Sequence, residues 1–286
     1  MTATEEGKRA PAENDKVELA SEEQLVGWVE RFSDYRHRPS KKALLAWLER
    51  FLPEHVIIGH KLLDAVQVVS EMEIHQGYKD ALADLGGWSK SAKERAGRWY
   101  FVGVGSAGES GPAMLRMFRE ANGLTSDSWQ SFFITAKDLP RLALSAFDHV
   151  VFVDDFAGTG NQMVDYWPIM EELVASEAKC YLLLTAVTTD AAKAIKDKTE
   201  LELRASITLE KCKNVFSEEC KIFTDDEKAA LEKYGKIAWK DHPRGFGGCG
   251  LTLVLSHKTP NNTLPVLHAN HDRWEGPFPR NLIKAA

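Results

Sequence analysis

The chain has 286 residues, of which 44% are hydrophobic and 27% are charged, and its formal net charge at pH 7 is −6. This composition is that of an ordinary globular protein long enough to bury a large core. The net negative charge argues against broad, charge-driven binding to nucleic acid. Four cysteines without a CxxC spacing favour free thiols over disulfides or a zinc site.

Targeting signals are missing from the sequence. No run approaches about 18 uncharged apolar residues, and the N-terminus lacks the basic start and apolar core of a signal peptide. We therefore expect a cytoplasmic protein that makes no membrane contact. Residues 1–20 are polar and without a period, which predicts a flexible leader.

The next segment carries helical patterns. Ser21 and Gln24 form a capping-box signature, and apolar residues at helical spacing follow them. Further helices are predicted for "KKALLAWLERFL", which stops at Pro53, and for "HVIIGHKLLDAVQVVSEME". We expect residues 21–98 to form an all-helical N-terminal region.

Strands then alternate with helices over residues 99–210. The predicted strands are "RWYFVGVG", "SFFIT", "HVVFVDD", "KCYLLLTAV" and "ELRASITL", and helices are expected from about Pro112, over 138–146, after Gly160 and behind the fourth strand. This alternation predicts an α/β core with right-handed crossovers and a mostly parallel sheet. Residues 211–286 are less regular, with a helix near "DDEKAALEKYGKIAW" and a strand "LTLVLSHK".

Asp154 and Asp155 stand side by side at the end of the third core strand, where ligands bind in open α/β sheets. Two adjacent carboxylates repel each other, and vicinal sugar hydroxyls would supply the hydrogen-bond donors that carboxylates accept. A glycine-rich loop and a helix N-terminus follow, which suit a phosphate. The pattern predicts a ribose 5-phosphate site whose phosphate loop consists of Ala157, Gly158, Thr159, Gly160 and Asn161.

The stretch "VVFVDDFAGTG", residues 150–160, resembles the signature of type I phosphoribosyltransferases. The resemblance implies a phosphoribosyltransferase-like, Rossmann-like fold that binds phosphoribosyl pyrophosphate or a nucleotide 5′-monophosphate, with the acids on the ribose hydroxyls. Two positions depart from the family. Gln162 stands where a hydroxyl residue is usual, and Gly158 stands where purine-salvage relatives carry an acid that handles the base nitrogen.

The family also needs an earlier loop for pyrophosphate, and "GVGSAGESGPAML" occupies that place. A glycine-rich turn before a helix is a reasonable anion nest. Glu109 stands where salvage members often have a basic residue, and it would repel pyrophosphate unless Mg²⁺ lies between them or the side chain turns away. The resemblance thus implies Mg²⁺ brought by pyrophosphate, with no metal site of the protein's own. Glu109 joins Asp154 and Asp155 as a candidate catalytic residue, and the loop candidates are Gly105, Ser106, Gly108, Ser110 and Gly111.

The tail "GFGGCGLTLVLSHKTPNNTLPVLHANHDRWEGPFPR" resembles the ending of divergent phosphoribosyltransferase-like proteins of prokaryotic conflict and anti-phage systems, some of them retron-associated. That resemblance implies a C-terminal hood, residues 211–286, over the site. It also implies a defence effector or toxin with a partner protein or its nucleic acid. Asn261, Asn262 and Trp274 are candidates for binding a base. Alternatively, the Asn pair caps a turn and Trp274 packs in the core.

Other functions stay open. "GVGSAG" matches a dinucleotide-binding fingerprint, but that interpretation lacks the acid expected after the second strand and leaves the aspartate pair unexplained. A transferase would act at C1′ through an oxocarbenium-like state. A nucleotide N-glycosidase would use Glu109 to position water or the ribose. A non-catalytic nucleotide-binding sensor or toxin subunit would keep only the fold.

Overall fold

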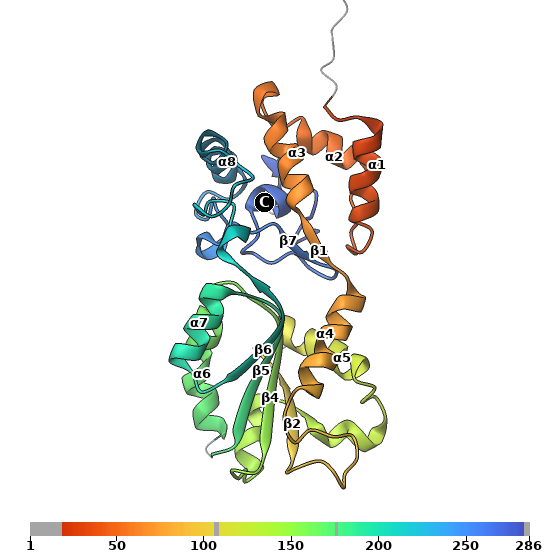
Figure 1. The fold of residues 1–286 in the computed structure, drawn as a ribbon, viewed down its shortest axis with the longest axis vertical. Coiled ribbons are helices and arrows are strands. Elements are labelled where there is room, and N and C mark those ends of the chain that lie inside the picture. Colours follow the sequence, from red (N-terminus) through yellow and green to blue (C-terminus); the bar gives the residue numbers. More distant parts are fainter. Residues whose placement is uncertain (1–18, 106–108, 175–176, 283–286) are drawn as a thin grey trace, which may run out of the picture.

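A five-stranded parallel sheet forms the lower part of the molecule in Figure 1, in a computed structural model that describes residues 19–105, 109–174 and 177–282. The strand order is β3-β2-β4-β5-β6, and every neighbouring pair is parallel. The α/β fold class is therefore confirmed. The strands are β2 Trp99–Gly103, β3 Phe133–Ile134, β4 His149–Ala157, β5 Lys179–Thr188 and β6 Glu202–Leu209.

Helices cover both faces of this sheet (Figure 1). One face packs against α4 Glu71–Ala83 and α5 Ser110–Ala121, and the other packs against α6 Asn161–Val174 and α7 Thr189–Lys198. Side chains of β4 alternate between the two cores. Val151 and Val153 belong to the first, while Val150 and Phe152 belong to the second. This alternation explains why the predicted strand is an uninterrupted apolar run.

The connection between β3 and β4 differs from the prediction. An α-helix over 138–146 was expected, but the chain forms a short 3-10 helix, η3 Ala136–Arg141, and then irregular backbone. Pro140 inside this segment cannot donate a backbone hydrogen bond, and Ala143 has a positive φ of 43°. A second 3-10 helix, η2 Asp127–Phe132, comes directly before the very short β3.

The N-terminal region is not all-helical as predicted. After α1 Glu22–Arg31, α2 Lys41–Leu48, η1 Pro53–His55 and α3 Val56–Ala65, the expected long third helix gives way to strand β1 Gln67–Val69. Its valines favour extended backbone, and Ser70 forms a capping box with Glu73 that starts α4 anew. Strand β1 pairs in parallel with β7 Leu253–Leu255, far along the chain.

Helices α1 to α3 pack with the C-terminal part of the chain and not with the sheet. Together they form the cap lobe, residues 19–69 and 211–282. Most of its buried side chains share one hydrophobic core, while Val69, Leu253 and Leu255 of β1 and β7 pack in the core of the sheet. The indoles of Trp47 and Trp274 both donate to the carbonyl of Val266, at 2.8 and 2.9 Å. The C-terminal elements of the lobe are η4 Lys211–Lys213, α8 Asp225–Ala238, η5 Phe246–Gly248, β7, α9 Pro265–His268, β8 Asn270–His271 and β9 Trp274–Glu275.

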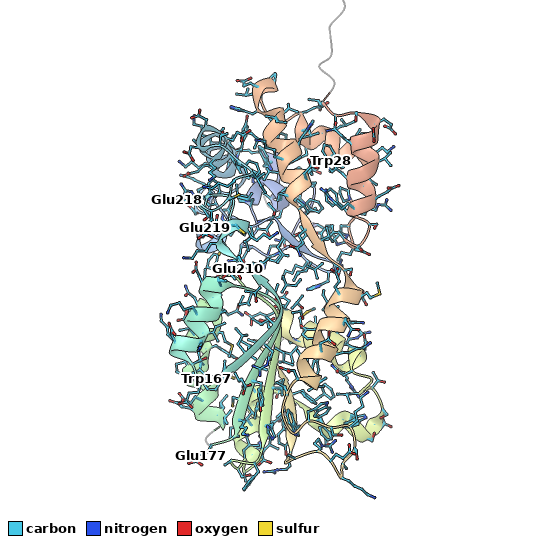
Figure 2. The ribbon with its side chains drawn as sticks, in the orientation of Figure 1. Trp28, Trp167, Glu177, Glu210, Glu218 and Glu219 are labelled. Carbon is cyan, nitrogen blue, oxygen red and sulfur yellow. The ribbon has the colours of Figure 1, made fainter. Side chains whose placement is uncertain are left out.

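Helix α4 belongs with the remaining residues, 70–210, which we call the sheet lobe. The packing therefore divides the chain at β1, whereas the sequence suggested a division near residue 98. Figure 2 shows Trp28 within the cap lobe and Trp167 within the sheet lobe. The indole of Trp28 donates to Asp64 at 2.7 Å. The predicted leader lies outside the described residues apart from its last two, and no helix within the described ranges could span a membrane.

Candidate functional site

The aspartate pair lies where β4 extends beyond the end of the neighbouring strand β2. Strand β2 ends at Gly103, which pairs with Val153, so Asp154 and Asp155 extend beyond the end of β2. On the other side β4 still pairs with β5, up to Ala157. The pair therefore stands at an open step in the carboxyl edge of the sheet, which is the position predicted for a ligand site.

Asp154 is buried, with 6% of its surface exposed. Its Oδ1 accepts hydrogen bonds from the Ser110 hydroxyl at 2.6 Å and from the Asp155 backbone N–H at 2.9 Å. The hydroxyl of Tyr78, on α4, donates to the Asp154 carbonyl at 2.8 Å. Burial raises the pKa of Asp154 to about 8, and the neighbouring charge of Asp155 adds to the shift. Both effects favour the protonated form of Asp154.

Asp155 is the ionised member of the pair. Its Oδ2 lies 3.4 Å from Nε2 of His257, which comes from the cap lobe just after β7. Burial opposes the charge of Asp155, but His257, the Ser110 hydroxyl and Lys258 outweigh burial, so its pKa is lowered. One negative charge is thus shared over two adjacent carboxyl groups, held by contacts from both lobes.

The predicted phosphate loop runs from the end of β4 into α6. Gly160 has a φ of +74°, which favours glycine, and α6 starts at the next residue. The hydroxyl of Thr188 donates to the carbonyl of Gly158 at 2.7 Å and fixes the turn. A Cβ on Gly158 would lie 2.3 Å from the amide nitrogen of Asn262. The position at which purine-salvage relatives carry an acid is therefore filled by a cap-lobe amide.

A cavity of about 420 Å³ joins these features. It lies between the carboxyl edge of the sheet and the cap lobe, and it brings the aspartate pair, the phosphate loop and the tail turn together. The predicted site residues that line it are Ser110, Asp154, Asp155, Ala157, Gly158, Thr159, Gly160, Asn161, Asn261 and Asn262.

The predicted pyrophosphate loop contributes less. Ser106 and Gly108 lie outside the described residues. Of the loop candidates Gly105, Ser110 and Gly111, which the structure describes, Ser110 alone lines the cavity. A Cβ on Gly105, whose φ is +87°, would lie 2.0 Å from Oε2 of Glu109, so this carboxylate folds back over the Gly105 backbone. Gly111 packs with similar closeness on the Val104 backbone, where a side chain would clash.

Trp274 does not face the cavity, which overturns its assignment as a base-binding residue. Only 2% of it is exposed, and its ring packs against Phe51 and Tyr234. The tail asparagines have structural contacts as well. The Asn262 amide donates to the Phe246 carbonyl at 3.0 Å and to the Cys249 sulfur at 3.3 Å, and the Asn261 carbonyl accepts from the Phe246 N–H at 2.9 Å. Both still line the cavity while they hold the tail turn.

Three residues of the site were missed in the sequence. Lys258 and Arg280 line the cavity, and His257 contacts Asp155. Burial is the main reason that the pKa of Lys258 and the pKa of Arg280 are lowered, and Arg280 lowers that of Lys258 further. The available signal was their place at the two ends of the tail motif, before "TPNNTLP" and in "FPR". Across the described ranges, no group of three or more His, Cys, Asp or Glu side chains has the arrangement of a metal site.

Comparison with known proteins agrees with this geometry. No curated protein matches the chain. A family model described as PRTase-CE matches residues 44–280, which include every strand of the sheet, the aspartate pair, the phosphate loop and the tail through Arg280. The match spans far more than half of the chain, so the protein belongs to the PRTase-CE family, a family of the phosphoribosyltransferase type.

Proposed function

We propose that the 420 Å³ cavity binds phosphoribosyl pyrophosphate or a nucleotide 5′-monophosphate. The observation that carries the proposal is the joining of the aspartate pair and the phosphate loop in one cavity. Its volume falls in the range of small-molecule sites, roughly 300 to 1,000 Å³. Membership of a phosphoribosyltransferase-type family supports the same class of ligand.

The ribose would lie over the aspartate pair. The ionised Asp155 can accept hydrogen bonds from a diol, while the protonated Asp154 can donate one in return. The 5-phosphate would lie against the backbone N–H groups of residues 157–161 and the N-terminus of α6, a helix of 14 residues. Ligand and protein then match in both hydrogen bonding and charge.

Mg²⁺ would enter with the diphosphate of phosphoribosyl pyrophosphate. The ion prefers oxygen ligands, and diphosphate oxygens and water supply most of them. The ionised carboxylate of Asp155 at the cavity wall suits this ion as a further ligand or as a partner of its water. Bound Mg²⁺ would neutralise part of the negative charge of the diphosphate.

We further propose a glycosyl-transfer reaction at C1 of the ribose of phosphoribosyl pyrophosphate. The bond from C1 to the diphosphate oxygen would break with its electron pair on the departing pyrophosphate, and an acceptor nucleophile would form the new bond to C1 and release its proton. The negative charge shared by the pair would favour the oxocarbenium-like character that such reactions develop. The alternative N-glycosidase loses support because the Glu109 carboxylate folds back over Gly105 and does not line the cavity. Labelled nucleotide separates the two reactions, since hydrolysis releases free base with no acceptor or phosphoribosyl pyrophosphate added.

The non-catalytic sensor or toxin subunit is favoured by one observation. The Asn262 amide occupies the space in which an acid at position 158 would handle a base. A role in prokaryotic anti-phage defence is likewise proposed from the tail resemblance. Phage plating on cells that carry wild-type or Asp155→Asn protein tests this role. Equal protection by both proteins would show that defence does not depend on the cavity.

Isothermal titration calorimetry with phosphoribosyl pyrophosphate and Mg²⁺ tests the binding proposal. We expect wild-type protein to bind and Asp155→Asn to bind at least about 100-fold more weakly, since it loses charge-assisted hydrogen bonds. Asp226→Asn, at an exposed position in the first turn of α8, is the matched control and should bind as wild type does. Absence of heat from wild-type protein would reject the proposal.

A further inference from the structure

Two cations from distant parts of the chain line the same cavity. Lys258 follows β7, and Arg280 lies beyond β9, near the end of the described residues. Both side chains are partly buried, and each charge makes the other less favourable. Two like charges held together in a half-buried place are destabilising unless an anion joins them.

Within the described ranges, neither cation is in direct contact with a carboxylate, although the nearby charge of Asp155 favours the charged form of both. Neither residue forms an ion pair within 4.0 Å of a described carboxylate. Arg280 donates to the Thr259 carbonyl at 3.1 Å, a neutral acceptor, and the Lys258 ammonium has no hydrogen bond to a described residue. By contrast, Arg98 lies 2.7 Å from Asp148 in the sheet lobe. Unused N–H donors of both cations therefore remain for a ligand in the cavity.

Electrostatic interactions link both cations to the acids of the cavity. Lys258 directly follows His257, which contacts Asp155 at 3.4 Å, and the charges of Asp155 and Glu109 favour the charged form of Lys258. The charge of Asp155 also acts on Arg280. A ribose with its hydroxyls on the pair and its 5-phosphate on residues 157–161 would turn its C1 substituent toward these acids and cations.

We propose that Lys258 and Arg280 bind a diphosphate group on C1 of the ribose, and this rests on the proposed function. The cap lobe then supplies the positive charge that the pyrophosphate loop lacks at Glu109. It also follows that the cavity selects sugars with a diphosphate on C1 over ribose 5-phosphate and over nucleoside monophosphates. The cap lobe is in this way part of the anion site and not only a cover.

Calorimetry on the full chain tests this with three probes: phosphoribosyl pyrophosphate with Mg²⁺, inorganic pyrophosphate with Mg²⁺, and ribose 5-phosphate. We expect Lys258→Met and Arg280→Met each to weaken the two diphosphate probes by about 10- to 100-fold, because each loses charge-assisted hydrogen bonds. Ribose 5-phosphate should change by no more than about twofold. Lys258→Arg should retain most of the affinity, and Lys233→Met, exposed on α8, is the matched control.

Salt dependence adds a readout that a purely structural role would not change. The slope of affinity against ionic strength should become shallower in Lys258→Met, because one charge contact is lost. If both Met variants, shown to be folded by circular dichroism, bind diphosphate as wild type does while Asp155→Asn weakens phosphoribosyl pyrophosphate, this inference is wrong and the proposed function stands. If wild-type protein binds none of the three probes, this inference is wrong, and if it also fails to bind a nucleotide 5′-monophosphate, the proposed function is wrong as well.

Discussion

Strand β4 has buried acids at both ends, and the two ends differ. Asp148, just before the strand, is 2% exposed, and its oxygens accept from the Arg98 guanidinium and from the backbone and hydroxyl of Ser145. Arg98 holds the pKa of Asp148 well below its usual range. Asp154 is similarly buried, yet its pKa is raised to about 8. The Arg98 guanidinium outweighs burial at Asp148, whereas no cation comparably opposes the effect of burial at Asp154.

The two ends of β4 therefore have different roles: Asp148 stabilises the fold, and the aspartate pair belongs to the proposed ligand site. Asp148 has a full set of donors and ties together the segments before β2 and β4. The pair at the other end keeps acceptor capacity for a ligand, and its two carboxyl groups oppose each other's ionisation. Titratable groups held in an unfavourable state are typical of functional sites. Four predictions test the contrast, in order of decreasing expected effect.

Replacing Asp148 by Asn should destabilise the protein by about 3 kcal/mol at neutral pH, since an amide cannot accept all of the Arg98 and Ser145 donors. The folded-state pKa is depressed, so this stabilisation is fully present above the unfolded pKa of Asp148. It is lost as pH falls below that value. Urea unfolding at about pH 7 and about pH 3 measures both effects. Loss of less than about 0.5 kcal/mol at neutral pH would contradict the structural role.

Replacing Asp154 by Asn should have the opposite pH signature. The folded-state pKa is raised, so the folded protein keeps a proton that the unfolded chain releases, and wild-type stability declines as pH rises toward about 8. The Asn variant does not titrate there. The free energy of unfolding of the Asn variant, relative to that of wild type, should therefore increase by about 1 kcal/mol for each pH unit between about pH 6 and pH 8. A parallel pH profile for the two proteins would show that Asp154 is not protonated.

Contact between the lobes can be tested at Gly158. A Cβ there would lie 2.3 Å from the Asn262 amide, so Gly158→Ala should displace Asn262 from Phe246 and cost about 1 to 2 kcal/mol. Adding Asn262→Ala should recover part of this loss in a double-mutant cycle followed by urea unfolding. Gly27→Ala, where the added Cβ meets no atom within 4 Å, is the control. Strictly additive losses would argue against the contact.

The smallest effect is expected at His257. His257→Ala removes the 3.4 Å contact that favours the charged form of Asp155, so the pKa of Asp155 should rise toward its ordinary value. The free energy of unfolding should change by less than about 1 kcal/mol. Carbon-13 NMR titration of the aspartate carboxyl groups follows the shift. An unchanged Asp155 titration would show that His257 does not control the charge of the pair.

The sequence alone was sufficient to predict the strands of the sheet and the residues that form one wall of the cavity. Apolar runs bounded by glycine or charge predicted β2, β4 and β5, because buried parallel strands are continuously apolar. The aspartate pair and the phosphate loop are contiguous in the chain, so their place at the strand end follows from that strand alone. Local patterns were ambiguous where β1 interrupts the predicted third helix, since a short apolar run suits either a helix or a strand.

Only the tertiary structure showed which residues form the opposite wall of the cavity, on the side of the cap lobe. Lys258 and Arg280 lie more than a hundred residues from β4 in the sequence, and they reach the pair because α1 to α3 and the C-terminal residues bury one common core. The same packing encloses Trp274 and sets Asn262 against Gly158. Such contacts depend on how two hydrophobic cores meet, and no local period of the sequence records that.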